Sequence, residues 1–229
     1  MKKLDFKTWI LILGAFYFSG SLIQNLLAVK MLGTSTFTFC DSGTLISWLV
    51  FACMDIVTET MGKKSAIKYF TIASGLNLFF SIIYMIVMVL PGTDAVMSES
   101  FANVFGTNWR IVISSITAFW VGNYINAFIM YAMRVKSKNE NSKVGFIARA
   151  VVSTIFGQLV DNTLFSVMAF GPFGIPGSYE MPWVAIFQTV AFGTFMETVS
   201  EALFSPITAT VVKRLKTLRD KEDIKVIDQ

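Results

Sequence analysis

The sequence predicts an all-α integral membrane protein, folded as a single membrane domain of six transmembrane helices with both termini in the cytoplasm. Of its 229 residues, 54% are hydrophobic and only 15% are charged, whereas a soluble domain carries about a quarter charged residues. Apolar stretches of about 20 residues, the length that crosses a bilayer as a helix, recur along the whole chain. Basic residues gather in alternate loops between these stretches. Together these observations favour a multi-pass protein of the plasma (inner) membrane.

The apolar stretches give the expected spans in order. They cover residues 9–29, 44–61, 66–90, 111–133, 146–170 and 183–212, followed by a basic, charged cytoplasmic tail at 213–229. The first follows two lysines, but no small-residue cleavage site closes it, so we expect a retained span and not a signal peptide. The sixth is long and contains Pro206, which predicts a kink or an extension past the bilayer. Cys40 and Cys53 are expected to be free thiols.

The loops set the orientation. Of the 19 basic residues, 17 fall on one side, and only Lys30 and Arg110 fall on the other. The positive-inside rule places that basic side in the cytoplasm. The net charge of +4 therefore reflects sidedness and lipid contact, and nucleic acid is not expected as a partner.

Six spans with both ends inside give two halves of opposite topology, which is compatible with a three-plus-three inverted repeat. The second span of each half carries a polar cluster, although no residue-by-residue repeat is evident in the sequence.

Five carboxylates lie within the predicted spans, and no Lys, Arg or His accompanies them in the middle of a span: Asp55, Glu59, Asp161, Glu197 and Glu201. A carboxylate at membrane depth costs roughly 2.5–3.5 kcal/mol and usually has a function. Without buried basic partners, these groups point to donors or positive charge that come from outside: a substrate, an ion or protons.

Asp55 and Glu59 are four residues apart on the second span, so they share one helix face. Asp55 is the deeper group and the better site candidate. Glu59 lies close to the end of the span, where the alternative is a helix-end carboxylate that pairs with Lys63 or Lys64.

The fifth span carries a polar stripe of Thr154, Gln158 and Asp161, with Asn162 beside it. This cluster predicts a binding site at mid-span. The alternative is that these side chains only form hydrogen bonds between helices.

The sixth span places Glu197 and Glu201 on one face. They would titrate or close the site. The alternative is protonated glutamates hydrogen-bonded to neighbours such as Asn123 and Asn126 on the fourth span. Trp120, about ten residues into that fourth span, is expected to pack inside or to line a cavity.

These side chains suit one class of ligand. Carboxylates accept hydrogen bonds, and carboxamides both donate and accept them. A guanine-type base matches this set, because a carboxylate takes its ring N–H and exocyclic amine while a carboxamide donates to its carbonyl. The 22 Phe residues and Trp120 supply rings for stacking.

Two segments carry a family resemblance. Met54-Asp-Ile-Val-Thr-Glu-Thr-Met-Gly62 resembles the Asp-x-x-x-Glu-x-x-Gly segment of the queuosine precursor transporter family, also called the vitamin uptake transporter family. Ser153-Thr-Ile-Phe-Gly-Gln-Leu-Val-Asp-Asn-Thr163 resembles the Gly-Gln-x-x-Asp stretch of that family. The last span, from Glu201 through Thr208, is similar to its last helix.

The resemblance implies uptake of 7-deazaguanine bases: 7-cyano- or 7-aminomethyl-7-deazaguanine, the precursors of the tRNA nucleoside queuosine, or queuine itself. It makes Asp55, Glu59, Gln158 and Asp161 the expected binding residues. We expect a secondary transporter coupled to a proton or another cation, with no enzymatic activity and no cofactor. A homodimer is expected for a six-span transporter of this size.

Three other classes stay open at this point. One is a substrate-capture subunit of an ATP-driven importer, which would need another subunit because no Gly-x-x-x-x-Gly-Lys-Ser/Thr loop occurs. A second is a proton or cation pathway without an organic substrate. The third is a membrane-embedded enzyme with a metal held by acidic clusters, but the sequence contains no His and a metal site is not expected.

Overall fold

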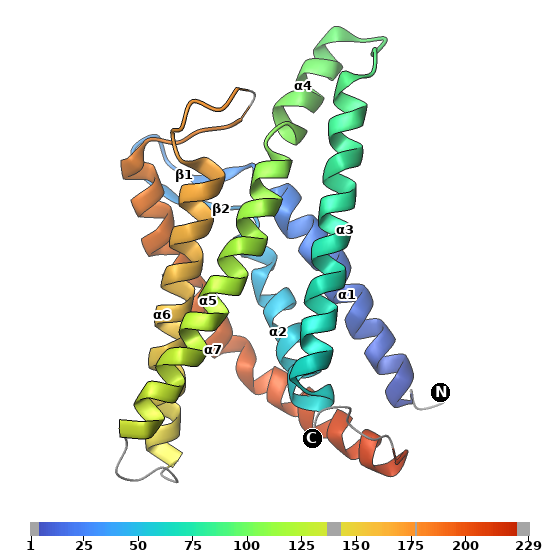
Figure 1. Ribbon diagram of the computed structural model, residues 1–229, viewed down its shortest axis with the longest axis vertical. Coiled ribbons are helices and arrows are strands. Elements are labelled where there is room, and N and C mark those ends of the chain that lie inside the picture. Colours follow the sequence, from blue (N-terminus) through green and yellow to red (C-terminus); the bar gives the residue numbers. More distant parts are fainter. Residues whose placement is uncertain (1–4, 137–142, 177, 224–229) are drawn as a thin grey trace.

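The computed structural model describes residues 5–136, 143–176 and 178–223. Figure 1 shows a bundle of long helices. In the described residues these are α1 (Phe6–Leu27), α2 (Thr44–Met61), α3 (Lys63–Val89), α5 (Asn108–Lys136), α6 (Lys143–Phe170) and α7 (Trp183–Lys221). The shorter elements are α4 (Ala95–Phe105) and the strands β1 (Met31–Gly33) and β2 (Thr38–Asp41).

Each of the six apolar stretches overlaps one long helix. Within the described ranges, α1, α2 and the Lys64–Val89 part of α3 are long and apolar enough to cross a membrane. The fold is thus that of a helical membrane protein. Six crossings, the cytoplasmic termini and the inverted repeat stay predictions.

The bundle has two distinct ends (Figure 1). At one end, which we call the hairpin end, lie β1, β2, α4 and the segment that joins α6 to α7. At the other, which we call the basic end, lie the α2–α3 junction, the start of α1 and the last turns of α7, with Lys213 and Lys216. Three of the four basic segments assigned to one side, at the start of α1, at the α2–α3 junction and at the end of α7, therefore gather at one end of the molecule, while residues 137–142 of the fourth lie outside the described residues.

The hairpin departs from the purely helical prediction. β1 and β2 pair antiparallel, with Met31 opposite Asp41 and Leu32 opposite Cys40. Gly33 permits the tight return, because a Cβ at this position would collide with the backbone oxygen of Phe37. Strands this short show no period-two pattern, so the sequence gives little indication of them.

Local signals explain where the helices begin and turn. Asp5 caps α1 by accepting a hydrogen bond of 3.1 Å from the Thr8 amide, and Asp94 caps α4 in the same way. Between α2 and α3 the chain reverses at Gly62, whose φ of 89° is readily adopted only by glycine. The Met61-Gly62-Lys63 sequence therefore folds two antiparallel helices with almost no loop.

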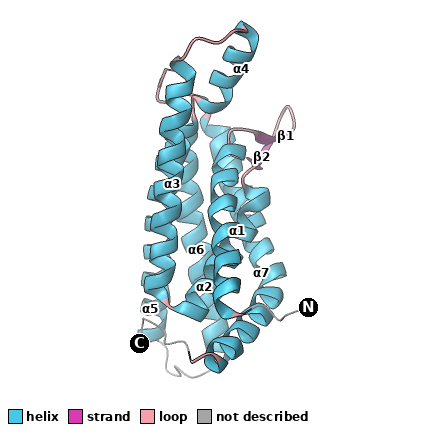
Figure 2. Cartoon of the chain, turned by 90° about the vertical axis from the view of Figure 1, so that its right-hand side faces the viewer, coloured by secondary structure: helices cyan, strands magenta, loops and turns pink. Residues whose placement is uncertain are grey.

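The longest helix, α7, contains Pro206 and continues beyond it. Proline removes the amide that would bond to the Ala202 carbonyl. The Ser205 hydroxyl donates to that carbonyl instead, at 3.1 Å. Past this point α7 crosses beneath α2 toward the start of α1, where Glu222 Oε1 accepts a 3.0 Å hydrogen bond from the Phe6 amide (Figures 1 and 2).

Two apolar clusters hold the bundle together. The one nearer the basic end joins α1, α2 and α7 through side chains such as Tyr17, Ile56 and Leu215. The one nearer the hairpin end joins α5, α6 and α7 through Ile111, Phe170 and other residues. Cavities lined by polar side chains lie between these clusters.

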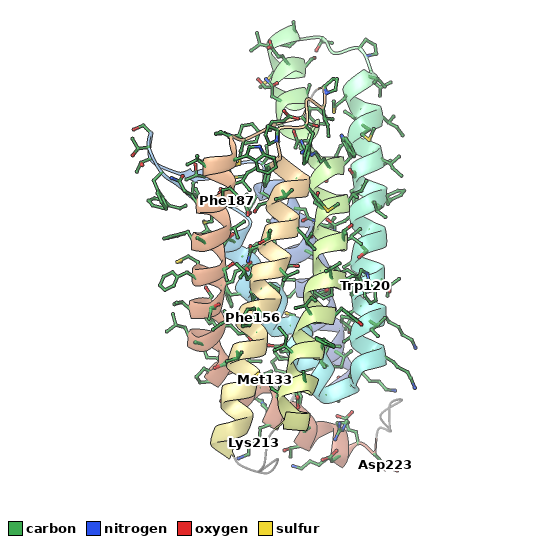
Figure 3. All side chains as sticks on the ribbon, turned by 60° about the vertical axis from the view of Figure 1, so that its left-hand side comes forward. Trp120, Met133, Phe156, Phe187, Lys213 and Asp223 are labelled. Carbon is green, nitrogen blue, oxygen red and sulfur yellow. The ribbon has the colours of Figure 1, made fainter. Side chains whose placement is uncertain are left out.

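Large apolar side chains also cover the outside, as expected for a lipid-facing surface. Figure 3 shows Phe156 and Phe187 pointing away from the bundle, and they are 49% and 67% exposed. Trp120 is 48% exposed and packs edge-on against Phe70 with ring centroids 5.2 Å apart. The prediction that Trp120 is interior was therefore wrong, since its distance from the helix end did not show which face of α5 it occupies.

Candidate functional site

A central cavity of about 120 Å³ lies between α2, α5, α6 and α7. Its lining combines carboxylates, carboxamides and aromatic rings, and no Lys or Arg is among the described residues that line it. The polar members are Asp55, Asn123, Thr154, Gln158, Asp161 and Glu201, and the apolar members include Phe51, Met54 and Phe119.

The close packing of α5 on α6 sets the position of Asp161. A Cβ at Gly122 would lie 2.9 Å from the Asp161 Cβ and 3.1 Å from the Gly157 carbonyl oxygen. Glycine at position 122 thus lets the two helices approach closely, as small residues do in membrane bundles. Any larger side chain there would displace α6 and the carboxylate that it carries.

A second cavity, of about 860 Å³, opens between α2 and α7 at the basic end. We call it the basic-end cavity. Asp55 and Glu201 line both this cavity and the central one. Trp48 and Phe204, which also line it, stack with ring centroids 4.2 Å apart. The stack holds α7 against α2 beside the two carboxylates.

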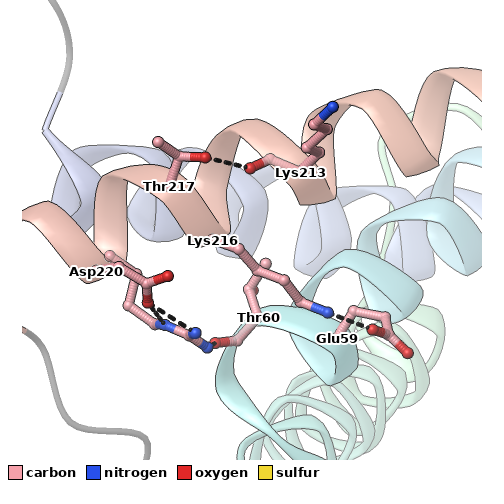
Figure 4. A network of polar contacts seen from close by, with 7 residues as sticks. Glu59, Thr60, Lys213, Lys216, Thr217 and Asp220 are labelled. Carbon is pink, nitrogen blue, oxygen red and sulfur yellow. Dashed lines mark hydrogen bonds and ion pairs between the residues drawn. The ribbon is translucent and has the colours of Figure 1, made fainter.

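Glu59 also lines the basic-end cavity and does not reach the central one. Its Oε2 lies 2.6 Å from Lys216 Nζ on α7 (Figure 4). One turn further along α7, the Arg219 guanidinium donates to the Thr60 carbonyl at 2.9 Å. Glu59 is therefore a helix-end carboxylate whose partner on α7 fastens the end of α2 to that helix.

A third cavity, of about 80 Å³, lies toward the hairpin and is here called the hairpin-end cavity. In it Asn162 Nδ2 donates to Glu197 Oε2 at 2.7 Å. Gly193 makes room for this pair, since a Cβ there would lie 3.3 Å from Asn162 Oδ1. Asp161 lines both this cavity and the central one.

Asp41 closes the hairpin-end cavity from the end of β2. It is 8% exposed, and its Oδ1 accepts a 2.8 Å hydrogen bond from the Gly43 amide at the start of α2. Burial raises the pKa of Asp41 to about 6. Position 41 falls between the predicted spans 9–29 and 44–61, so the sequence did not mark Asp41 as part of a cavity.

The structure divides the predicted site residues among the three cavities. Asp55, Asn123, Gln158, Asp161 and Glu201 line the central cavity, Glu59 lines the basic-end cavity, and Asn162 and Glu197 line the hairpin-end cavity. The side chain of Asn126 lies outside the described residues.

Glu197 has a hydrogen-bond partner on α6 that the alternative weighed above did not name. Asn162 bonds to Glu197, whereas Asn123 Nδ2 donates to the Phe119 carbonyl of its own helix at 2.8 Å. Within the described part of the chain, no group of three or more His, Cys, Asp or Glu side chains is arranged to hold a metal ion.

Comparison with known proteins identifies the family. The sequence profile described as putative vitamin uptake transporter matches residues 41–211. The chain belongs to this family. The match begins at Asp41 and extends through the central cavity, so the resemblance drawn from residues 54–62 and 153–163 is confirmed. No curated protein and no solved structure matches the chain.

Membership of the vitamin uptake transporter family, together with the three apolar helices, makes this chain a membrane protein of a transport family. The matched region contains every lining residue of the central cavity. By contrast, the α1 side of the hairpin-end cavity and the α7 residues beyond 211 that line the basic-end cavity lie outside the match.

Proposed function

We propose that this vitamin uptake transporter imports queuosine precursor bases, namely 7-cyano- or 7-aminomethyl-7-deazaguanine or queuine, by secondary transport. It would act as a multi-pass protein of the plasma membrane with its basic end in the cytoplasm, as a homodimer, coupled to a proton or another cation. Family membership supports transport. The chemistry of the central cavity supports this class of substrate.

The central cavity carries the proposal. The described residues that line it include three carboxylates and no basic side chain. Unpaired carboxylates at membrane depth are costly, so a guest that supplies several N–H donors or a positive charge is favoured over an anionic one. The volume of about 120 Å³ lies below the roughly 300–1,000 Å³ of pockets for drug-sized ligands. A single heterocycle therefore suits this cavity better than a nucleotide.

The arrangement of donors and acceptors matches the guanine-like edge of such a base. In this assignment Asp161 accepts from the ring N–H and the exocyclic amine, while the Gln158 carboxamide donates to the carbonyl. Asp55, across the cavity on α2, accepts from a second donor or from an aminomethyl group. The Phe119 ring, fixed by stacking on Phe70 at 4.0 Å between centroids, offers its other face to the heterocycle.

The test uses a cell that lacks both base synthesis and its own importer, supplied with each base in turn. Expression of this chain should restore queuosine-modified tRNA with at least one of the bases. Absence of rescue by every base, with normal amounts of protein in the membrane, would contradict the proposed substrate class.

Replacing Asp161→Asn in the same assay should strongly reduce rescue at normal membrane expression, because one of the two acceptor oxygens becomes an NH2 donor that would face a donor of the base. Asp94→Asn is the matched control. It makes the same chemical change at the N-cap of α4, outside the three cavities. Asn and Asp are equally good N-cap residues. Full rescue by Asp161→Asn would refute the assigned role.

Purified protein in vesicles separates secondary transport from the alternative of a capture subunit. Base uptake by the chain alone, driven by a proton or cation gradient, supports the proposal. Binding without uptake would favour a subunit that depends on an ATP-driven partner.

A further inference from the structure

The three cavities follow one another along the bundle, and neighbouring cavities share lining residues. Asp55 and Glu201 belong to both the basic-end and central cavities, while Asp161 and Phe119 belong to both the central and hairpin-end cavities. Phe51 on α2 lines all three of them. In the part of the chain that the structure describes, it is also the one residue that the basic-end and hairpin-end cavities have in common.

The neighbours of Phe51 are fixed more firmly than Phe51 itself. Trp48, one turn earlier on α2, stacks on Phe204, and Phe119 across the cavities stacks on Phe70 with an interplanar angle of 13°. Phe51 is half-buried and borders all three cavities, and within the described residues its ring forms no such stack. Its ring therefore faces open space, between neighbouring rings that are held by stacking.

We propose that the Phe51 ring is the partition between the hairpin-end and basic-end cavities, which a transported base must displace on its way through the bundle. This inference rests on the proposed transport function and names the residue that controls the path. An apolar ring at a narrow point excludes water and ions. The carboxylates stand on both sides of it, Asp161 toward the hairpin end and Asp55 with Glu201 toward the basic end. A base with several N–H donors thus meets hydrogen-bond acceptors on both sides of the Phe51 ring.

The experiment measures access from the basic end without any base. In a Cys40→Ser, Cys53→Ala background, Ser115→Cys places a thiol in the hairpin-end cavity, and Thr208→Cys places one in the basic-end cavity. A membrane-impermeant cationic methanethiosulfonate reagent is added to the basic-end face of vesicles that contain the full chain. With Phe51 intact, Ser115→Cys should react many-fold more slowly than Thr208→Cys.

Phe51→Ala should then accelerate the reaction of Ser115→Cys several-fold and leave that of Thr208→Cys unchanged. Phe156→Ala is the matched control, because it removes an equal ring that is 49% exposed on α6 and lines none of the three cavities, and it should not accelerate Ser115→Cys. Phe51→Leu, a smaller change, replaces Phe51→Ala if the latter does not elute as a monodisperse protein.

Two results would overturn the proposal. One is an unchanged Ser115→Cys rate in a monodisperse Phe51 variant. The other is a Ser115→Cys rate equal to that of Thr208→Cys while Phe51 is intact. The thiol reaction rates are measured in the absence of any base. They can therefore be interpreted even if the tRNA rescue assay fails. The partition and the substrate are thereby tested separately.

Discussion

The hairpin end and the basic end of this transporter are held by opposite kinds of polar contact. At the hairpin end, Arg110 is 4% exposed, and its guanidinium donates to the carbonyls of Met168 and Gly171, both at 2.6 Å. At the basic end, the Lys216–Glu59 ion pair is equally short, but its side chains are 40% and 59% exposed. Desolvated contacts are expensive to break and exposed ones are cheap. We therefore expect the basic end to open more readily than the hairpin end.

The largest effect is expected from Arg110→Met. It removes one buried and one partly buried hydrogen bond of a charged donor, each worth roughly 1.5–3 kcal/mol, so the free energy of unfolding should fall by about 4 kcal/mol. Arg110→Lys keeps the charge but cannot reach both carbonyls in the same geometry, and it should give an intermediate loss. Thermal unfolding in detergent measures both. A melting temperature unchanged by Arg110→Met would remove the basis of the comparison.

Asp41→Asn should change how stability depends on pH. The pKa of Asp41 is raised from 3.8 to about 6 by burial, so folding favours the protonated form. The stability that this group contributes is full below about pH 4 and is lost as the pH rises through about 6. Asn keeps an oxygen that can accept from the Gly43 amide and carries no charge. At about pH 7 the variant should be more stable than the parent by up to about 3 kcal/mol.

Unfolding curves of the two proteins over a pH series test this prediction, because their difference isolates Asp41 from the other carboxylates. The curves should meet at low pH and separate above it. Parallel curves across the series would show that Asp41 does not titrate as its burial implies.

The smallest effect is expected at the basic end. Lys216→Met should lower the free energy of unfolding by less than about 1 kcal/mol, because exposed ion pairs are screened by water and salt. A double-mutant cycle with Glu59→Gln at low and high salt gives the coupling between the two side chains. Lys213→Met, in the same cavity, is the control. A coupling energy as large as the effect of Arg110→Met would abolish the contrast between the two ends.

Much of the fold could be predicted because each span is a run of apolar residues that are neighbours in the sequence. The predicted stretch 44–61 has the bounds of α2, and Gly62 marks the reversal into α3. Helical spacing also placed Gln158 and Asp161 on one face, and the structure sets both beside Asp55 around one cavity. Their role in binding stays a prediction.

The pairings between helices could not be predicted, because one sequence does not reveal which helices become neighbours. Glu59 bonds to a lysine 157 residues away, and Glu197 bonds to Asn162 of α6, a pairing that the sequence did not indicate. The sequence also did not show how α5 is rotated about its own axis, so Trp120 was wrongly predicted to lie inside the bundle. The short helix α4 carried an overlooked signal, since Asp94 is a recognisable cap ahead of it.

The serine next to Pro206 has a mechanical consequence. The proline removes one backbone hydrogen bond from α7, and Ser205 satisfies the Ala202 oxygen from its own side chain. Bending at this point therefore breaks no further bond of the helical ladder. What resists bending of α7 here is therefore the set of contacts that its last turns make with α1 and α2, such as the packing of Leu215 and the Arg219–Thr60 hydrogen bond.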